Sequence, residues 1–288
     1  MKKYLPILFI LIFFANSTSL LSQYWYEYNE TTVSTPTGVT IEAWQFNEDD
    51  YDDFDAPTIA AQNYAWTYGY NCRILANSTK YYNCHGFAWY NIEGQMSQSD
   101  LRWINELDNE EDPNIAKYYT GDNRSYTETQ TYSNHLRVSY VGDDHSAVTT
   151  EDEDSLVSKW AYGPLVKHTV DQCPFYDNSE IKYYKLWPRV NGSTSVMCYN
   201  NQRTYTSNMS IPGSTYSWTR ETNLFNYVSG AGTTSYTVSA TNGTGDAWVQ
   251  IQITTPSGEV ATSSKYYTWV GKAQVQSISG PGSTTPYT

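Results

Sequence analysis

Two patterns of hydrophobic and polar positions divide the chain. Residues 190–270 contain short runs in which apolar and polar side chains alternate, as in Ser235–Ala240 and Ala247–Thr254. Turn-forming sequences such as Asn242-Gly-Thr-Gly245 separate these runs. Alternation is typical of strands with one buried face, and many short strands at this spacing indicate a sandwich. The pattern predicts an all-β sandwich of immunoglobulin-like size over residues 189–272.

The region before the sandwich, residues 23–188, mixes helical and strand periods and holds all four histidines. It is expected to form one larger domain. Beyond the sandwich, Ile278–Ser283 echoes Val190–Ser195, so residues 273–288 are predicted to begin a further repeat or to form a tail. The sandwich resembles the PKD-like or Ig-like repeats of secreted surface proteins.

The N-terminus has the order of segments expected of a secretory signal. Two lysines precede the apolar run Leu5–Ala15, and a polar stretch with small residues follows it. A bilayer span needs about 20 apolar residues, more than this run provides. Residues 1–22 are therefore predicted to be a signal peptide cleaved near Ser19 or Ser22. The mature protein is expected to be secreted, periplasmic or at the cell surface, without a membrane span.

The formal net charge of −13 argues against two classes of binding partner. With 17 basic and 30 acidic residues, the chain lacks the basic surface that nucleic acid and anionic membranes require. No EF-hand loop, CxxC or HxxxH spacing is present, so no metal or cofactor is expected. The acidic clusters are interpreted as solvated surface: Glu48–Asp55, Glu106–Asp112 and Asp143–Asp154.

Four cysteines are present in a chain that is expected to be exported, where disulfides persist. Keeping Cys84 free makes Cys72–Cys173 the expected bridge, with Cys198 unpaired in the sandwich. The alternative is that Cys84 itself forms a structural disulfide with Cys72 or Cys173.

Cys84 lies in the segment that carries the candidate chemistry. A turn-like stretch precedes it, and Cys84 to Ile92 is expected to form a short helix. A cysteine in the first turn of a helix is near unpaired N–H groups and the positive end of the dipole, which favours thiolate. His145, which begins an extended run 61 residues later, is the candidate base. Gly86 would allow the helix start to pack closely on a sheet.

The segment Asn83–Ala88 resembles the nucleophile segment of NlpC/P60 peptidases, and His145–Val148 resembles the histidine strand of the NlpC/P60 and CHAP families. The stretches Val157–Leu165 and His168–Pro174 resemble a related branch of secreted proteins, so that the resemblance covers roughly Gln62–Trp187. It implies an α+β, papain-like core in which a helix bearing the cysteine packs on an antiparallel sheet. It also implies hydrolysis of amide bonds in peptidoglycan stem peptides.

The sequence departs from that family pattern at His85, at Asn83 and at the residue that orients the base. The family places the orienting residue about where Ser158 or Lys159 stands. Lysine cannot accept a hydrogen bond from imidazole, and serine accepts one weakly. His168 on the following run is the better candidate for the third catalytic residue. His85 is expected to point away from the nucleophile and to serve packing or substrate contact.

Two other classes of function remain open at this point. One is a catalytically inactive adhesin or binding protein, which contacts a glycan or protein through the sandwich or through exposed aromatic residues. The other is a structural surface protein built of repeats on a disulfide-stapled domain. The first predicts that Cys84 is oxidised in a disulfide and unreactive. The second predicts further repeats beyond Thr288 and no pocket around Cys84.

Overall fold

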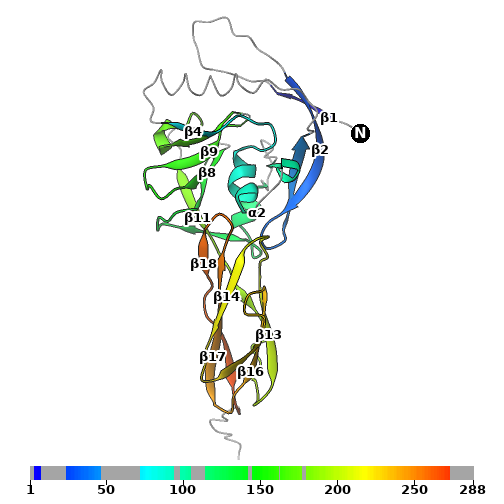
Figure 1. Cartoon of the computed structure of the whole chain (residues 1–288), viewed down its shortest axis with the longest axis vertical. Coiled ribbons are helices and arrows are strands. Elements are labelled where there is room, and N and C mark those ends of the chain that lie inside the picture. Colours follow the sequence, from blue (N-terminus) through cyan, green and yellow to red (C-terminus); the bar gives the residue numbers. More distant parts are fainter. Residues whose placement is uncertain are drawn as a thin grey trace, which may run out of the picture.

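The computed structural model consists of two regions stacked along the long axis of the molecule (Figure 1). Of the residues that it describes, 46% are in strands and 9% are helical, and these strands form four sheets. It describes residues 3–7, 24–46, 72–93, 98–104, 114–141, 145–161, 163–176 and 180–272.

A seven-stranded antiparallel sheet is the centre of the first region. Its spatial order is β4 (Arg73–Ala76), β10 (Leu165–His168), β9 (Leu156–Lys159), β8 (His145–Thr149), β7 (Arg137–Tyr140), β11 (Ile181–Leu186) and β6 (Tyr126–Thr129). The register places Tyr140 opposite His145 on the neighbouring strand. All five residues of β8 are buried, so His145 begins a fully covered strand.

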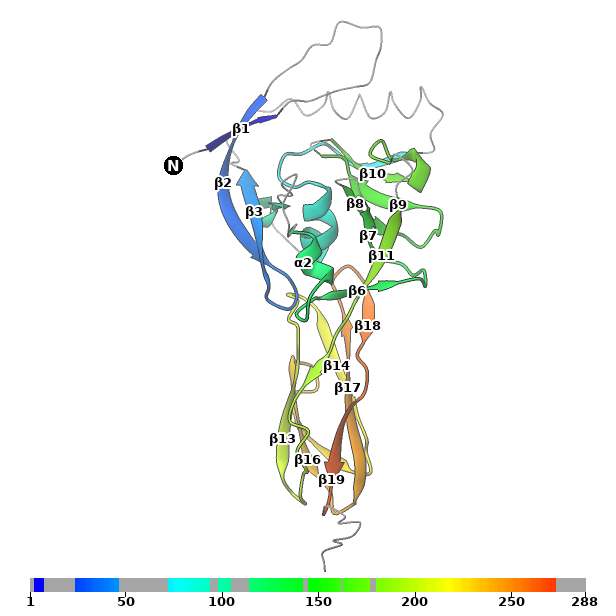
Figure 2. The same ribbon diagram turned by 180° about the vertical axis from the view of Figure 1, so that it is seen from behind.

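A second antiparallel sheet lies on the other side of the helical elements (Figure 2). Its order is β1 (Lys3–Ile7), β2 (Tyr24–Ser34), β3 (Thr40–Phe46) and β5 (Trp103–Ile104). Strand β1 pairs with β2 and lies inside the predicted signal peptide, most of which falls outside the described residues. The short helical elements outside the Cys84 segment are η3 (Gln98–Asp100), α2 (Ala116–Tyr119) and η4 (Val170–Gln172).

The helical segment 84–93 lies between these two sheets (Figure 2). It begins with two α-helical residues, Cys84 and His85, and continues as the π-helix η1 (Gly86–Tyr90) and the 3-10 turn η2 (Asn91–Glu93). Asn83 caps its start, since its Oδ1 accepts the backbone N–H of Gly86 at 2.8 Å.

Two asparagine side chains tie both ends of this segment to the residues around β5. At the start, Asn83 Nδ2 donates to the carbonyl of Ile104 at 2.8 Å, and its Oδ1 accepts the Ile104 N–H at 3.2 Å. At the end, Asn91 Oδ1 accepts the Arg102 N–H at 3.3 Å. The position of Cys84 is therefore set by side-chain bonds from outside the helix as well as by the helix itself.

Gly86 is required where this segment passes β5. A Cβ atom at position 86 would overlap the backbone carbonyl oxygen of Arg102. Gly86→Ala is expected to destabilise the protein by about 1–3 kcal/mol or more, because a backbone atom cannot move aside as a side chain can. Urea denaturation measures this loss. Gly121→Ala is the matched control for strain without overlap, because a Cβ at that positive-φ glycine meets nothing within 4 Å. Equal losses of unfolding free energy in Gly86→Ala and Gly121→Ala would contradict the claim that overlap with the Arg102 carbonyl is what destabilises Gly86→Ala.

An aromatic core holds the helical segment against the seven-stranded sheet. The ring of Trp89 contacts the rings of Tyr118, Tyr126 and Tyr184 at centroid distances of 5.4 to 5.8 Å. Its indole N–H donates to Ser146 Oγ on β8 at 2.9 Å. This packing brings the start of the helical segment to the start of β8.

The second region is built from two packed sheets (Figure 1). One has the order β12 (Val190–Asn191), β13 (Gln202–Ser207), β16 (Ser235–Ala240) and β15 (Phe225–Ser229). The other joins β14 (Thr215–Arg220), β17 (Gly245–Thr254) and β18 (Val260–Thr262), with β19 (Tyr266–Val270) also paired to β17. Buried alternate residues such as Tyr205, Val249 and Ile251 fill the space between them. Residues 273–288, expected to begin a repeat or tail, lie outside the described part of the chain.

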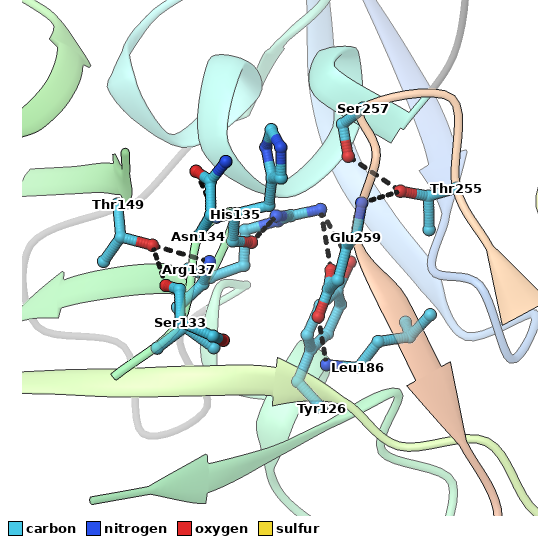
Figure 3. Close-up of polar contacts among 11 residues, drawn as sticks. Tyr126, Ser133, Asn134, His135, Arg137, Thr149, Leu186, Thr255, Ser257 and Glu259 are labelled. Carbon is cyan, nitrogen blue, oxygen red and sulfur yellow. Dashed lines mark hydrogen bonds and ion pairs between the residues drawn. The ribbon is translucent and has the colours of Figure 1, made fainter. Parts of the chain in front are cut away.

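A turn of the sandwich enters the first region. Glu259, at the end of the turn between β17 and β18, accepts the backbone N–H of Leu186 at 2.7 Å (Figure 3). Its other carboxylate oxygen lies 3.5 Å from the guanidinium of Arg137 on β7. Arg137 is 0% exposed and Glu259 is 5% exposed, so this ion pair is buried at the junction.

The predicted papain-like α+β class is wrong. The structure is predominantly β-sheet, and within the described residues its helical elements are short. The physical reason is composition, because the first region is rich in tyrosine and threonine, which favour strands. The helix that the sequence predicts at Cys84 is present only as one mixed ten-residue segment.

The predicted Cys72–Cys173 disulfide is also wrong for this structure, in which none of the four cysteines forms a disulfide. Cys72 and Cys173 are nevertheless neighbours. The Cys72 sulfur lies 3.9 Å from the carbonyl oxygen of Gln172. Of the acidic clusters, residues 48–55 and 106–112 lie outside the described part of the chain.

Candidate active site

Cys84 occupies the first position of the helical segment and is 6% exposed. The first backbone hydrogen bond of the segment runs from the Phe87 N–H to the Asn83 carbonyl at 2.9 Å. The sulfur therefore belongs to the first turn, where N–H groups have no carbonyl partner within the helix. That position was expected from the sequence, and Asn83 and Gly86 are the residues that fix it.

Two imidazoles interact with the Cys84 sulfur. His145 comes from the head of β8, and His85 follows Cys84 in the chain. Burial alone would raise the pKa of Cys84, but the charges of His85 and His145 and their hydrogen bonds outweigh it and lower the pKa to about 5. For His145, burial would lower the pKa, while Cys173 and Cys84 raise it to about 10. The two shifts have opposite directions, and both favour the thiolate–imidazolium form of the pair.

Nε2 of His145 is buried and makes no well-aligned hydrogen bond with any residue that the structure describes. Catalytic hydrogen bonds are often long or bent until substrate binds. This ring nitrogen is the natural atom to pass a proton to a substrate or to water.

His85 is held by β8 rather than turned away from the nucleophile. Its Nδ1 lies 2.8 Å from Ser146 Oγ, which also accepts the N–H of Trp89. The expectation that His85 points away from Cys84 is therefore wrong, because the ring interacts with the sulfur. The reason is the tight first turn, in which neighbouring residues can approach the same point before the helix becomes regular.

The ring of His145 is enclosed by residues from two other elements. Phe175 stacks on it at a centroid distance of 4.7 Å and an interplanar angle of 22°. Tyr140 meets it edge-on at 5.0 Å. The buried thiol of Cys173 interacts with both His145 and Tyr140. Phe175 is 37% exposed, so the enclosed ring lies close to solvent on that side.

The three residues considered for the orienting role have other partners. Ser158 Oγ lies 2.7 Å from His168 Nε2, and His168 Nδ1 lies 2.8 Å from the carbonyl of Thr169. Both ring nitrogens of His168 are thus occupied. Burial lowers the pKa of His168 to about 4, so the ring is neutral at physiological pH.

Lys159 is a fully buried lysine close to the nucleophile. Its amine donates to the carbonyl oxygens of Thr79 and Ala161 at 2.9 and 2.5 Å, and lies 5.2 Å from the centroid of the Tyr82 ring. Burial lowers its pKa well below the ordinary value, while Cys84 opposes that shift. The amine is therefore held by two backbone carbonyls near the sulfur, and these hydrogen bonds do not involve His145.

Sequence reasoning missed Ser146, Tyr140, Phe175 and the contact of Cys173 with His145. The sequence indicated Ser146 only indirectly. Side chains alternate along a strand, so Ser146 is placed on the face of β8 opposite His145. Cys173 was assigned to a disulfide, which hid its position beside the candidate base. Among the described residues, no cluster of histidine, cysteine and carboxylate side chains has an arrangement that could hold a metal ion.

Comparison with known proteins gives no family for the chain. No family model matches the sequence, and no curated protein matches it closely enough to count as a relative. With the β-rich fold, this overturns the resemblance to NlpC/P60 and CHAP proteins. Within the described residues, no helix is long and apolar enough to cross a membrane. The fold and site define a two-region β protein with a buried cysteine–histidine pair.

Proposed function

We propose that the chain is a thiol hydrolase that cleaves amide bonds through Cys84 and His145. The observation that carries the proposal is the placement of a buried, unbridged cysteine in the first turn of a helical segment, in contact with an imidazole from a separate strand. A structural cysteine in an apolar core needs neither feature.

The proposed mechanism is acyl transfer in two steps. The Cys84 thiolate attacks the amide carbonyl carbon, and the carbonyl electron pair moves to the oxygen, which N–H groups at the helix start stabilise. His145 gives its proton to the leaving nitrogen, and the C–N bond breaks. The imidazole then removes a proton from water, whose oxygen attacks the thioester, releasing the acid and restoring thiolate and imidazolium.

For the substrate, the proposal specifies only the class of bond that is cleaved. A peptide amide fits the mechanism. The expectation of peptidoglycan stem peptides depended on a resemblance that the fold contradicts, so it is not part of the proposal. Export by a cleaved signal peptide also remains a proposal, as does contact with a cell surface through the sandwich.

Acylation of Cys84 is the direct test. The full chain without residues 1–22 is mixed with p-nitrophenyl acetate, and release of nitrophenol is followed together with the mass of each cysteine-containing peptide. We expect a burst of nitrophenol and an acetyl group on Cys84, absent in Cys84→Ala. Cys198→Ala is the control, because this exposed thiol in the sandwich is remote from the pair. A panel of short peptide amides then tests amide cleavage.

A burst that persists in Cys84→Ala would reject the proposal, as would acetylation of Cys198 alone. One rival function, an inactive binding protein, predicted an oxidised Cys84. In the structure that cysteine is not bridged. Of the exposed tyrosines of the sandwich, Tyr227 lies on β15, Tyr267 lies on β19, and Tyr199 lies in the turn before β13.

A further inference from the structure

One partly exposed side chain covers the ring of His145. Among the described residues, two aromatic rings contact the imidazole, Tyr140 edge-on at a centroid distance of 5.0 Å and Phe175 stacked at 4.7 Å. Tyr140 is 1% exposed, as is His145 itself, whereas Phe175 is 37% exposed. The ring of Phe175 therefore lies between the imidazole and solvent.

A tight turn places Phe175 over the imidazole. The N–H of Tyr176 donates to the carbonyl of Cys173 at 3.0 Å, which closes a four-residue turn with Pro174 and Phe175 at its centre. Proline at the second position of such a turn fixes the backbone angle φ there. Cys173 and Tyr176 pack in a small core that includes Tyr140. The two ends of the turn are therefore anchored, while the side chain at its tip stays at the surface.

Cys84 and His145 lie close together below the surface. The residues that follow them in the chain, His85 and Ser146, are 2.8 Å apart from Nδ1 to Oγ, which holds the start of the helical segment against the head of β8. Cys84 is 6% exposed and His145 is 1% exposed. Nε2 of His145 has no hydrogen-bond partner among the described residues, and a bound substrate can supply one. A substrate therefore has to pass surface side chains to reach both groups.

We propose that Phe175 is the entrance residue of the site, and that its ring limits the size of the group that a substrate can place beside His145. This inference rests on the proposed function, to which it adds a preference for substrates with a small group next to the scissile amide. A bulky group has to displace the Phe175 ring from its stacked position, whereas a small group does not.

The test compares two alkylating reagents that differ only by a benzyl group, iodoacetamide and N-benzyl iodoacetamide, in the full chain. Mass spectrometry follows the rate at each cysteine, and the readout is the ratio of the benzyl rate to the parent rate. A variant that changed the charge state of Cys84 would alter both rates equally, so the ratio reports access to the sulfur. Cys198 is exposed and gives the ratio for an uncovered thiol in the same molecule.

We expect a lower ratio at Cys84 than at Cys198. Phe175→Ala should raise the ratio at Cys84 by about 2- to 12-fold, which is the free energy of one aromatic contact expressed as a rate. Phe175→Leu should give an intermediate ratio, and Phe175→Tyr, which keeps the stacked ring, should leave the ratio unchanged. Leu75→Ala is the matched control, because it removes an exposed apolar side chain from β4, three strands away from β8 in the same sheet.

Equal ratios at Cys84 and Cys198 in the unmodified chain would overturn the inference, because no size limit would then exist. So would ratios in Phe175→Ala and Phe175→Leu no higher than in Leu75→Ala, with circular dichroism checking that each variant is folded. Alkylation requires no acyl transfer. Failure of the proposed function would therefore be seen separately, as a Cys84 that is alkylated but never acetylated by p-nitrophenyl acetate.

Discussion

His145→Ala is expected to move the midpoint of Cys84 alkylation from about 5 toward the ordinary thiol value of about 8.5. At pH 6 the thiolate fraction would fall roughly 300-fold over that full range. A thiolate of higher pKa is more nucleophilic, by roughly 40-fold for this difference. Because His85 also lowers this pKa and remains in the variant, the net loss of alkylation rate at pH 6 is expected to be at most about 10-fold, and iodoacetamide labelling followed by mass spectrometry measures it.

His85→Ala distinguishes the effect of His85 from that of His145, because His85 also lowers the pKa of Cys84. It should raise the midpoint while leaving hydrolysis dependent on His145. His168→Ala is the matched control, since it removes a buried histidine that is already neutral at pH 6. A midpoint that moves as far in His168→Ala as in His145→Ala would show that His168 takes part in the pair, as the sequence first indicated.

Loss of the buried ion pair at the junction is expected to have the largest effect on stability. Glu259→Leu removes the carboxylate beside Arg137 and leaves an uncompensated guanidinium that cannot lose its proton. Breaking such a pair costs about 3–5 kcal/mol. Arg137→Met should cost less, because burial already raises the pKa of Glu259 and the orphaned carboxyl can take up a proton. Its loss should shrink further as the pH falls.

The double variant Arg137→Met/Glu259→Leu is expected to recover most of the stability, because two apolar side chains can replace a buried pair at little cost. Guanidinium chloride unfolding of the four proteins gives the coupling free energy. Lys182→Met is the surface control, since its pair with Glu180 is exposed and is worth at most about 1 kcal/mol. A double variant as unstable as the sum of both singles would mean that the two side chains act separately.

Local features of the site could be predicted from the sequence because their causes are local. Asn83 and Gly86 flank Cys84 within three residues, and they define a capped, closely packed helix start. His145 begins a strand that follows a short acidic stretch. The same local features suggested a regular helix on a papain-like core. That prediction was wrong because the class of fold depends on how the strands pair into sheets, which these local features do not determine.

The remaining features depend on pairing between distant segments. The contact of Cys173 with His145 follows from the order of β8, β9 and β10 and from the turn after them, which no short pattern specifies. The Arg137–Glu259 pair joins residues 122 positions apart (259 − 137) in the two regions. A buried lysine such as Lys159 is uncommon, so residue type alone does not indicate its buried position.

The asparagine bonds at the two ends of the helical segment have a consequence for insertions and deletions. Asn83 and Asn91 fix both ends to residues 102–104, so the distance that the segment must span is set from outside. A π-helix has more residues in each turn than an α-helix, and η1 is a π-helix. With one residue fewer between Phe87 and Tyr90, the segment could adopt a regular α-helix and still span the same distance. Length changes there would alter the type of helix and leave the sulfur of Cys84 in place.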